Sequence, residues 1–244
     1  MPRRRKRRRV NLAPVLALLL VANVAAGLRW SPLTAPVRVR AMGVEPFDRP
    51  RIAQLLGALE GRSCLQIDPR EVETGVMAAP EVDSADFRRN LFGSASLRVA
   101  YRRPVARLEG TWNVLLAADG SLYPSRQTVG PLPLVRVPKE DLEPNLSIAS
   151  RWPVAPMVEL ASRIPRALAG DRNVIEYTSR GGLCLNISES GRVIFGPPQG
   201  LEEKLARLET LLKENPSLPK EIKELNLTAP SRPVVKLATP GGKQ

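Results

Sequence analysis

The 244-residue chain contains no histidine and only two cysteines, Cys64 and Cys184. Without histidine it lacks the commonest metal ligand and the commonest general base, so most hydrolase and metal-site mechanisms lose their usual residues. The cysteines stand far apart in the chain. An oxidising compartment would permit one disulfide between them, but we expect two small buried apolar residues, each in its own domain.

Motifs for chemistry are also scarce. The chain has no Walker-type glycine loop and no Cys or His cluster with metal-ligand spacing. Two short charge clusters, residues 139–141 and 202–204, are predicted to be solvated surface rather than catalytic groups. We therefore predict a protein that is not an enzyme and that takes no cofactor, metal or small-molecule substrate.

Positive charge is abundant but local. The chain has 37 Lys and Arg residues against 24 Asp and Glu, a net charge of +13. Seven of these cations lie in the first nine residues: Arg3, Arg4, Arg5, Lys6, Arg7, Arg8 and Arg9. Such a run suits a nucleic acid or a membrane surface. Because residues 10–28 hold no ionised side chain and are strongly apolar, a lipid partner is favoured over nucleic acid.

Residues 10–30 are predicted to form a transmembrane helix surrounded by membrane lipid. At about 1.5 Å per residue the segment spans about 30 Å, the thickness of a hydrocarbon core. Trp30 suits the interface, and the basic residues 1–9 are expected to form a cytoplasmic tail. The alternative is a signal peptide cleaved after Ala26, since residues 24–26 are small. Both interpretations export the rest of the chain.

After a linker, residues 31–36, the pattern predicts a first domain over residues 37–110. Apolar alternation in residues 37–44 is typical of a strand, and Ile52, Leu55, Leu56 and Leu59 recur on one helical face, with Asp48 as the expected helix cap. Asp68 followed by Pro69 predicts the start of a second helix. Two strands are expected at residues 82–89 and 96–108. The order is strand, helix, helix, strand, strand.

Residues 111–237 are predicted to form a second, mostly antiparallel β domain, and residues 238–244 a flexible tail. Short apolar runs alternate with turn dipeptides such as Asp119-Gly120 and Gly181-Gly182. Helical patterns at residues 157–168 and 201–213 interrupt them, and the leucine stripe of the second is expected to pack on the sheet. The whole fold class is α+β with one membrane helix.

The first domain resembles the POTRA domain of the bacterial division proteins called FtsQ or DivIB. The segments VRVRAMGVEPFDRPRIAQLL and APEVDSADFRRNLFGSASLRVAYRRPVARLEG carry the resemblance. VIFGPPQGLEEKLARLETLL and IKELNLTAPSRPVVK are similar to that family's second domain. Two departures stand out: Arg102-Arg103 replace the family's Glu-Arg, and residues 226–229 lack its basic and aromatic anchors.

The resemblance implies a scaffold of the cell division machinery, or divisome, anchored once in the bacterial inner membrane at the septum with its C-terminus outside the cytoplasm. It connects early and late division proteins through protein–protein contacts, and its implied partners are FtsB and FtsL. A terminal strand near residues 232–237 would offer a sheet edge for strand addition. The candidate residues are Val234, Val235, Lys236 and Leu237. The alternative is a secreted or envelope-associated POTRA-containing binding protein, released by signal-peptide cleavage.

Overall fold

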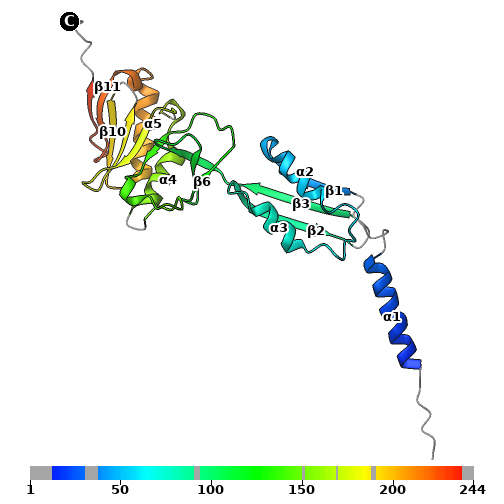
Figure 1. Ribbon diagram of the computed structural model, residues 1–244. Helices are drawn as coiled ribbons and strands as arrows, with labels where there is room; N and C mark the ends of the chain where they lie inside the picture. Colours follow the sequence, from blue (N-terminus) through cyan, green and yellow to red (C-terminus); the bar gives the residue numbers. More distant parts are fainter. Residues whose placement is uncertain are drawn as a thin grey trace, which may run out of the picture. The chain divides into compact units, whose positions relative to one another are not determined.

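The computed structural model describes residues 13–30, 38–90, 94–149, 152–168, 170–187 and 191–237. It has mixed α and β content and divides into two compact units, one ending at Tyr101 and the other beginning at Arg102 (Figure 1). This division falls before the expected domain boundary at residues 110/111. We describe each unit by itself.

The predicted transmembrane helix is wrong. The structure describes the N-terminal helix α1 over Ala13–Trp30, and residues 10–12 of the predicted segment lie outside the described residues. Among the residues that the structure describes, no helix is both long and apolar enough to cross a membrane. The fold class stated from the sequence is corrected accordingly.

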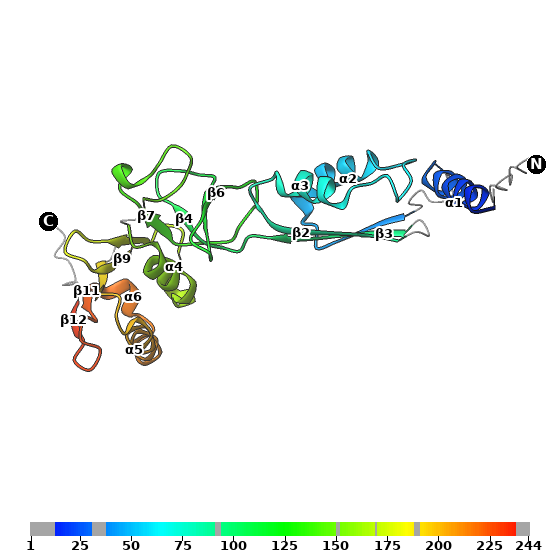
Figure 2. The ribbon, with the colours of Figure 1, turned by 90° about the horizontal axis from the view of Figure 1, so that it is seen from below.

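The first unit contains a three-stranded sheet with two helices on one face. Along the chain follow β1 (Arg38–Met42), the 3-10 turn η2 (Pro46–Asp48), α2 (Arg49–Gly57), α3 (Pro69–Met77), β2 (Val82–Arg89) and β3 (Ser94–Tyr101). The sheet order is β1-β3-β2, with β1 parallel and β2 antiparallel to the central β3. Figure 2 shows α2 and α3 on the same side of β2 and β3.

Sequence patterning explains these elements. The side chain of Asp68 accepts a hydrogen bond from the backbone N–H of Arg70 at 2.9 Å, which caps α3 as its position before Pro69 predicts. Ile52 of α2 and Val76 of α3 are buried against Leu97 and Val99 of β3. The core of this unit therefore lies between the helices and one face of the sheet.

Asp48 does not cap α2 as expected. Its carboxylate is only 1% exposed and accepts hydrogen bonds from Arg51 at 2.6 and 2.7 Å and from the Tyr101 hydroxyl at 2.8 Å. Arg51 also donates to the carbonyls of Gly75 and Val76. Asp48 accordingly raises the pKa of Arg51, and burial together with Asp48 raises the pKa of Tyr101. This network ties α2 to the end of α3 and to the end of β3.

The strand expected at residues 96–108 is two strands in two sheets. β3 ends at Tyr101, and β4 (Pro104–Leu108) belongs to the sheet of the second unit. Pro104 lacks an N–H and restricts the residue before it, so a continuous ladder through this point is unfavourable. The buried positions also change phase there, from Ala95, Leu97 and Val99 in β3 to Ala106 and Leu108 in β4, so the two strands do not share one alternation.

The second unit is built on a nine-stranded mixed sheet of order β12-β11-β10-β9-β8-β7-β4-β5-β6. Its remaining strands are β5 (Val114–Ala117), β6 (Leu122–Pro124), β7 (Leu134–Arg136), β8 (Val174–Tyr177), β9 (Leu183–Ile187), β10 (Gly191–Gly196), β11 (Ile222–Asn226) and β12 (Val234–Leu237). The helical elements are η3 (Lys139–Asp141), α4 (Val154–Arg163), η4 (Arg166–Leu168), α5 (Leu201–Glu214) and α6 (Leu218–Glu221). Neighbouring strands pair antiparallel at five junctions and parallel at three, β10·β11, β4·β7 and β7·β8.

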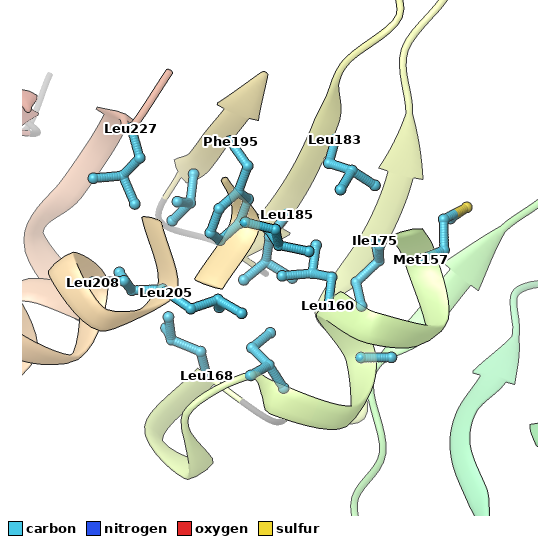
Figure 3. Close-up of a cluster of buried hydrophobic side chains, with 14 of the residues drawn as sticks. Met157, Leu160, Leu168, Ile175, Leu183, Leu185, Phe195, Leu205, Leu208 and Leu227 are labelled. Atoms are coloured by element: carbon cyan, nitrogen blue, oxygen red, sulfur yellow. The ribbon is translucent and has the colours of Figure 1, made fainter. Parts of the chain in front are cut away.

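The main core of this unit lies between the sheet and helices α4 and α5. The leucine stripe of α5 is buried, as predicted: Leu201, Leu205, Leu208 and Leu211 are each at most 8% exposed. They meet Met157 and Leu160 of α4 and strand residues such as Phe195 (Figure 3). At about 25 cal/mol per Å² of apolar area, this cluster is the main source of stability in the unit.

The Asp48 network yields a stability prediction. Replacing Asp48 with Asn removes the charge that Arg51 faces in a buried site, so we expect the first unit to lose about 3 kcal/mol. Hydrogen exchange of peptides covering β3 would measure the loss. Asp83→Asn, on an exposed residue of β2, is the matched control and should change little. Equal effects of the two substitutions would contradict the role given to Asp48.

Candidate partner-binding edge

The last described strand, β12, ends the nine-stranded sheet. It pairs only with β11, antiparallel, placing Val234 opposite Asn226, Val235 opposite Leu225, Lys236 opposite Glu224 and Leu237 opposite Ile222. A terminal strand presents every second N–H and C=O away from its neighbour. The four residues named from the sequence as a candidate edge are therefore the four residues of this strand.

Two side chains of β12 lie on the same face of the sheet as the apolar core, but they are not buried by helices α4 and α5. Val235 is opposite Leu225, which is fully buried, and Leu237 is opposite Ile222, which is 2% exposed. Yet Val235 is 39% exposed and Leu237 is 54% exposed. Since facing residues of paired strands share a face of the sheet, the apolar layer reaches β12 and remains open to solvent there.

The opposite face of the edge is polar and neutralised. Lys236 of β12 donates to Glu224 of β11 at 2.8 Å, and Glu224 also accepts from Arg192 of β10 at 2.7 Å. Farther along the sheet, Arg136 of β7 binds Glu109 at 2.5 Å and Glu176 of β8 at 2.7 Å. Cations and carboxylates alternate in this cross-strand ladder. The ladder holds β12 on the sheet through its side chains as well as its backbone.

The ladder changes the acidity of its carboxyl groups. Hydrogen bonds from Lys236 and Arg192 lower the pKa of Glu224, and a hydrogen bond from Arg136 lowers the pKa of Glu109. Both groups are therefore ionised at neutral pH. Arg192 and Arg136 show the reciprocal effect, since their carboxylate partners raise the pKa of each guanidinium.

Two of the other sheet edges have backbone donors that are missing or already occupied. At the far end of the large sheet, β6 has three residues and ends in Pro124, which has no N–H to donate. In the first unit, the backbone N–H of Phe87 on the edge strand β2 donates to the Glu73 carboxylate at 2.9 Å. Glu73 thus occupies a donor that an added strand would need. No such cap is found on β12 among the described residues.

The remaining site predictions fall elsewhere. Arg3, Arg4, Arg5, Lys6, Arg7, Arg8 and Arg9, named for membrane topology, lie outside the described residues. Trp30, named with them, is the last residue of α1.

The two charge clusters predicted to be solvated each bury one member. Lys204 is 4% exposed, and its ammonium donates to the carbonyl of Pro197 at 2.6 Å. Burial lowers its pKa. Asp141 is 7% exposed. Sequence proximity to other charges concealed both, although Lys204 stands three residues after Leu201 on the buried helical face.

The described residues bring few reactive groups together. Cys64 and Cys184 are both free and buried, and burial raises the pKa of the Cys184 thiol to about 11, which keeps it protonated at neutral pH. Ser217 and Lys220 have the spacing of a Ser-x-x-Lys motif, which sequence analysis missed, but both are exposed around the four-residue helix α6. Within the described ranges no three His, Cys, Asp or Glu residues cluster as metal ligands.

The ladder generates a pH prediction for the edge. Because the pKa of Glu224 lies below its ordinary value of 4.5 in the folded protein, the unfolded chain binds its proton first as pH falls. The stabilising effect of Glu224 should therefore be complete above pH 4.5 and decline as pH falls below it.

Urea midpoints of the native chain and of Glu224→Gln, measured across this range at low salt, check the prediction. The two midpoints should converge in acid. A gap that keeps the same size from pH 7 to pH 3 would contradict it. Exposed Glu209→Gln on α5 is the control.

The chain was compared with known protein families and with curated proteins. No known family matches the chain, and no curated protein matches it either.

Proposed function

We propose that this protein is a non-enzymatic assembly factor of the bacterial division machinery, and that it holds a partner by adding the partner's strand to β12. One observation carries the proposal: Val235 and Leu237 continue the core face of the sheet but remain 39% and 54% exposed. An apolar layer left open at a sheet edge is stabilised when another strand covers it.

The mode of binding follows from the edge. An extended partner segment would pair with the outward N–H and C=O groups of β12, and these main-chain bonds would supply affinity. Side chains at alternate positions of that segment would pack beside Val235 and Leu237 and bring selectivity. On the opposite face, Lys236 would favour a nearby carboxylate, although Glu224 already neutralises part of its charge.

The division role rests on the resemblance of four segments of the chain, two in each predicted domain, to the FtsQ or DivIB family. A strand-helix-helix-strand-strand unit followed by a sheet with a C-terminal edge is consistent with that resemblance. It makes the extracytoplasmic segments of FtsB and FtsL the first partners to test, with the division septum as the expected place of action.

A substitution pair on β12 separates the core face from the polar face. Leu237→Asp places a charge where the partner's apolar side chains would pack, so affinity for the partner segment should fall by about a hundredfold. Val234→Thr, an equally exposed position on the other face, should change affinity by less than about threefold. Isothermal titration with purified FtsB and FtsL segments from the same organism measures both. Equal affinities for the two variants would refute edge capture.

Two single prolines test the backbone. Consecutive N–H groups of an antiparallel strand point alternately toward and away from the neighbour, so only one of Val235→Pro and Lys236→Pro removes an outward donor. That variant should have a melting temperature closer to that of the native chain than the other proline variant has, and yet it should not bind the partner segment. If it binds as tightly as the native chain, main-chain pairing does not supply the affinity.

The cellular role has its own test. Depletion of the protein should produce undivided filaments, because the partners would no longer be brought together at the septum. A Leu237→Asp gene should fail to restore division, whereas a Val234→Thr gene should restore it. Cells that divide normally without the protein would contradict the division role while leaving the binding mode of β12 open to the titration.

A further inference from the structure

The first unit separates its charges between its two sides. Residues 38–101 contain nine arginines, no lysine, and nine Asp and Glu residues, so this stretch is neutral as a whole. On the helical side, α2, α3 and the residues next to them hold six carboxylates against four arginines, a net charge of −2: Asp48, Glu60, Asp68, Glu71, Glu73 and Glu81 against Arg49, Arg51, Arg62 and Arg70. The opposite face of the sheet carries the reverse sign.

Strand register places three arginines close together on that face. Arg40 of β1 and Arg88 of β2 both lie opposite Ser96 of the central strand, and Arg98 lies two residues farther along β3. With strands about 4.8 Å apart, the three Cα atoms lie within about 10 Å of one another. We call Arg40, Arg88 and Arg98 the basic face.

The basic face is exposed and incompletely neutralised. Helices α2 and α3 cover the other side of the sheet (Figure 2), and all three arginines are exposed. Asp86 pairs with Arg88 at 3.0 Å, in an ion pair whose two side chains are 78% and 44% exposed. Asp86 also lies directly opposite Arg98 in the strand register, but among the described residues it forms its ion pair with Arg88 and not with Arg98. Three arginines against one carboxylate leave the basic face with two positive charges in excess.

The large sheet provides the contrast. Its polar face carries cations and carboxylates in alternation, from Glu109 and Arg136 to Glu224 and Lys236. Each carboxylate there meets at least one cation. The exposed sheet face is therefore charge-balanced in the second unit and positive in the first. Because the second unit keeps its exposed face soluble without excess positive charge, solvation alone does not explain the arginines of the first unit.

From this segregation we infer that the basic face is a second docking surface, one that binds an acidic segment of a partner protein. Carboxylates spaced along an extended chain match guanidinium groups about 5 to 10 Å apart, and Arg binds carboxylates in bidentate pairs. A lipid surface is a poorer fit, because such recognition usually takes four to eight cations. This site lies in a different unit from β12 and does not depend on the division role.

A site-resolved titration tests the inference. The ¹⁵N-labelled full chain is titrated at low salt with a peptide of alternating Glu and Ser, and backbone amide shifts are followed in β1, β2 and β3. Saturable shifts at Arg40, Ser96 and Arg98 are expected. In Arg40→Glu/Arg98→Glu the affinity read at these amides should fall by at least about tenfold. Reading separate amides distinguishes this face from the arginine-rich N-terminus.

Arg62→Glu/Arg70→Glu is the matched control, since it makes the same charge change in the same unit at exposed positions away from the sheet face. It should leave the shifts at Arg40, Ser96 and Arg98 intact. The inference is overturned if both double variants weaken binding equally, or if the peptide shifts only residues 3–9. It is also overturned if phosphatidylglycerol vesicles, and not the peptide, perturb the basic face.

Discussion

An open β-sheet must end somewhere, and how each end is closed decides what the protein can bind. The large sheet ends at one side in β6, a three-residue strand that closes on Pro124. Tyr123 there is buried in a small cluster with Leu115 and Ala117, beside Val129 and Leu132 of the following segment. The other side ends in β12, whose backbone and core-face side chains remain uncovered. This asymmetry underlies the proposed function.

The covered and uncovered parts of the sheet depend on each other. Helices α4 and α5 bury one face as far as Leu225 and Ile222, which fixes β11 in place. β12 is then held by its pairing with β11 and by the ladder through Glu224. A strand held mainly by its neighbour, with all four of its side chains exposed, is stable enough to present an edge and open enough to accept another strand.

The sequence pattern predicted where the helices and strands lie better than it predicted how they assemble into sheets and side-chain networks. Helix α5 follows from its leucine stripe and strand β3 from the alternation of Leu97, Val99 and Tyr101, because both patterns report which side chains are buried. The break between β3 and β4 was missed because apolar residues stand on both sides of Pro104, although the buried positions change from odd-numbered in β3 to even-numbered in β4. The buried Asp48 was taken for a helix cap, since its partners Arg51 and Tyr101 meet it only after the unit has folded.

The candidate site shows the same limit. Residues of β12 could be named in advance because a C-terminal strand is often an edge. Which of them continue the core face could not, because that depends on the register with Leu225 and Ile222. The basic face likewise depends on the register of three strands that are separated in sequence. The apolar run at residues 10–30 predicted a membrane span, but no helix among the described residues is long and apolar enough to cross a membrane.

Hydrogen exchange of β12 with and without a bound partner segment tests the central claim most directly. If a strand adds to this edge, the outward-pointing amides among residues 234–237 should become protected from exchange on binding, while the amides already paired with β11 gain little. Protection confined to other parts of the chain, with the β12 amides exchanging as fast in the complex as in the free protein, would contradict the account.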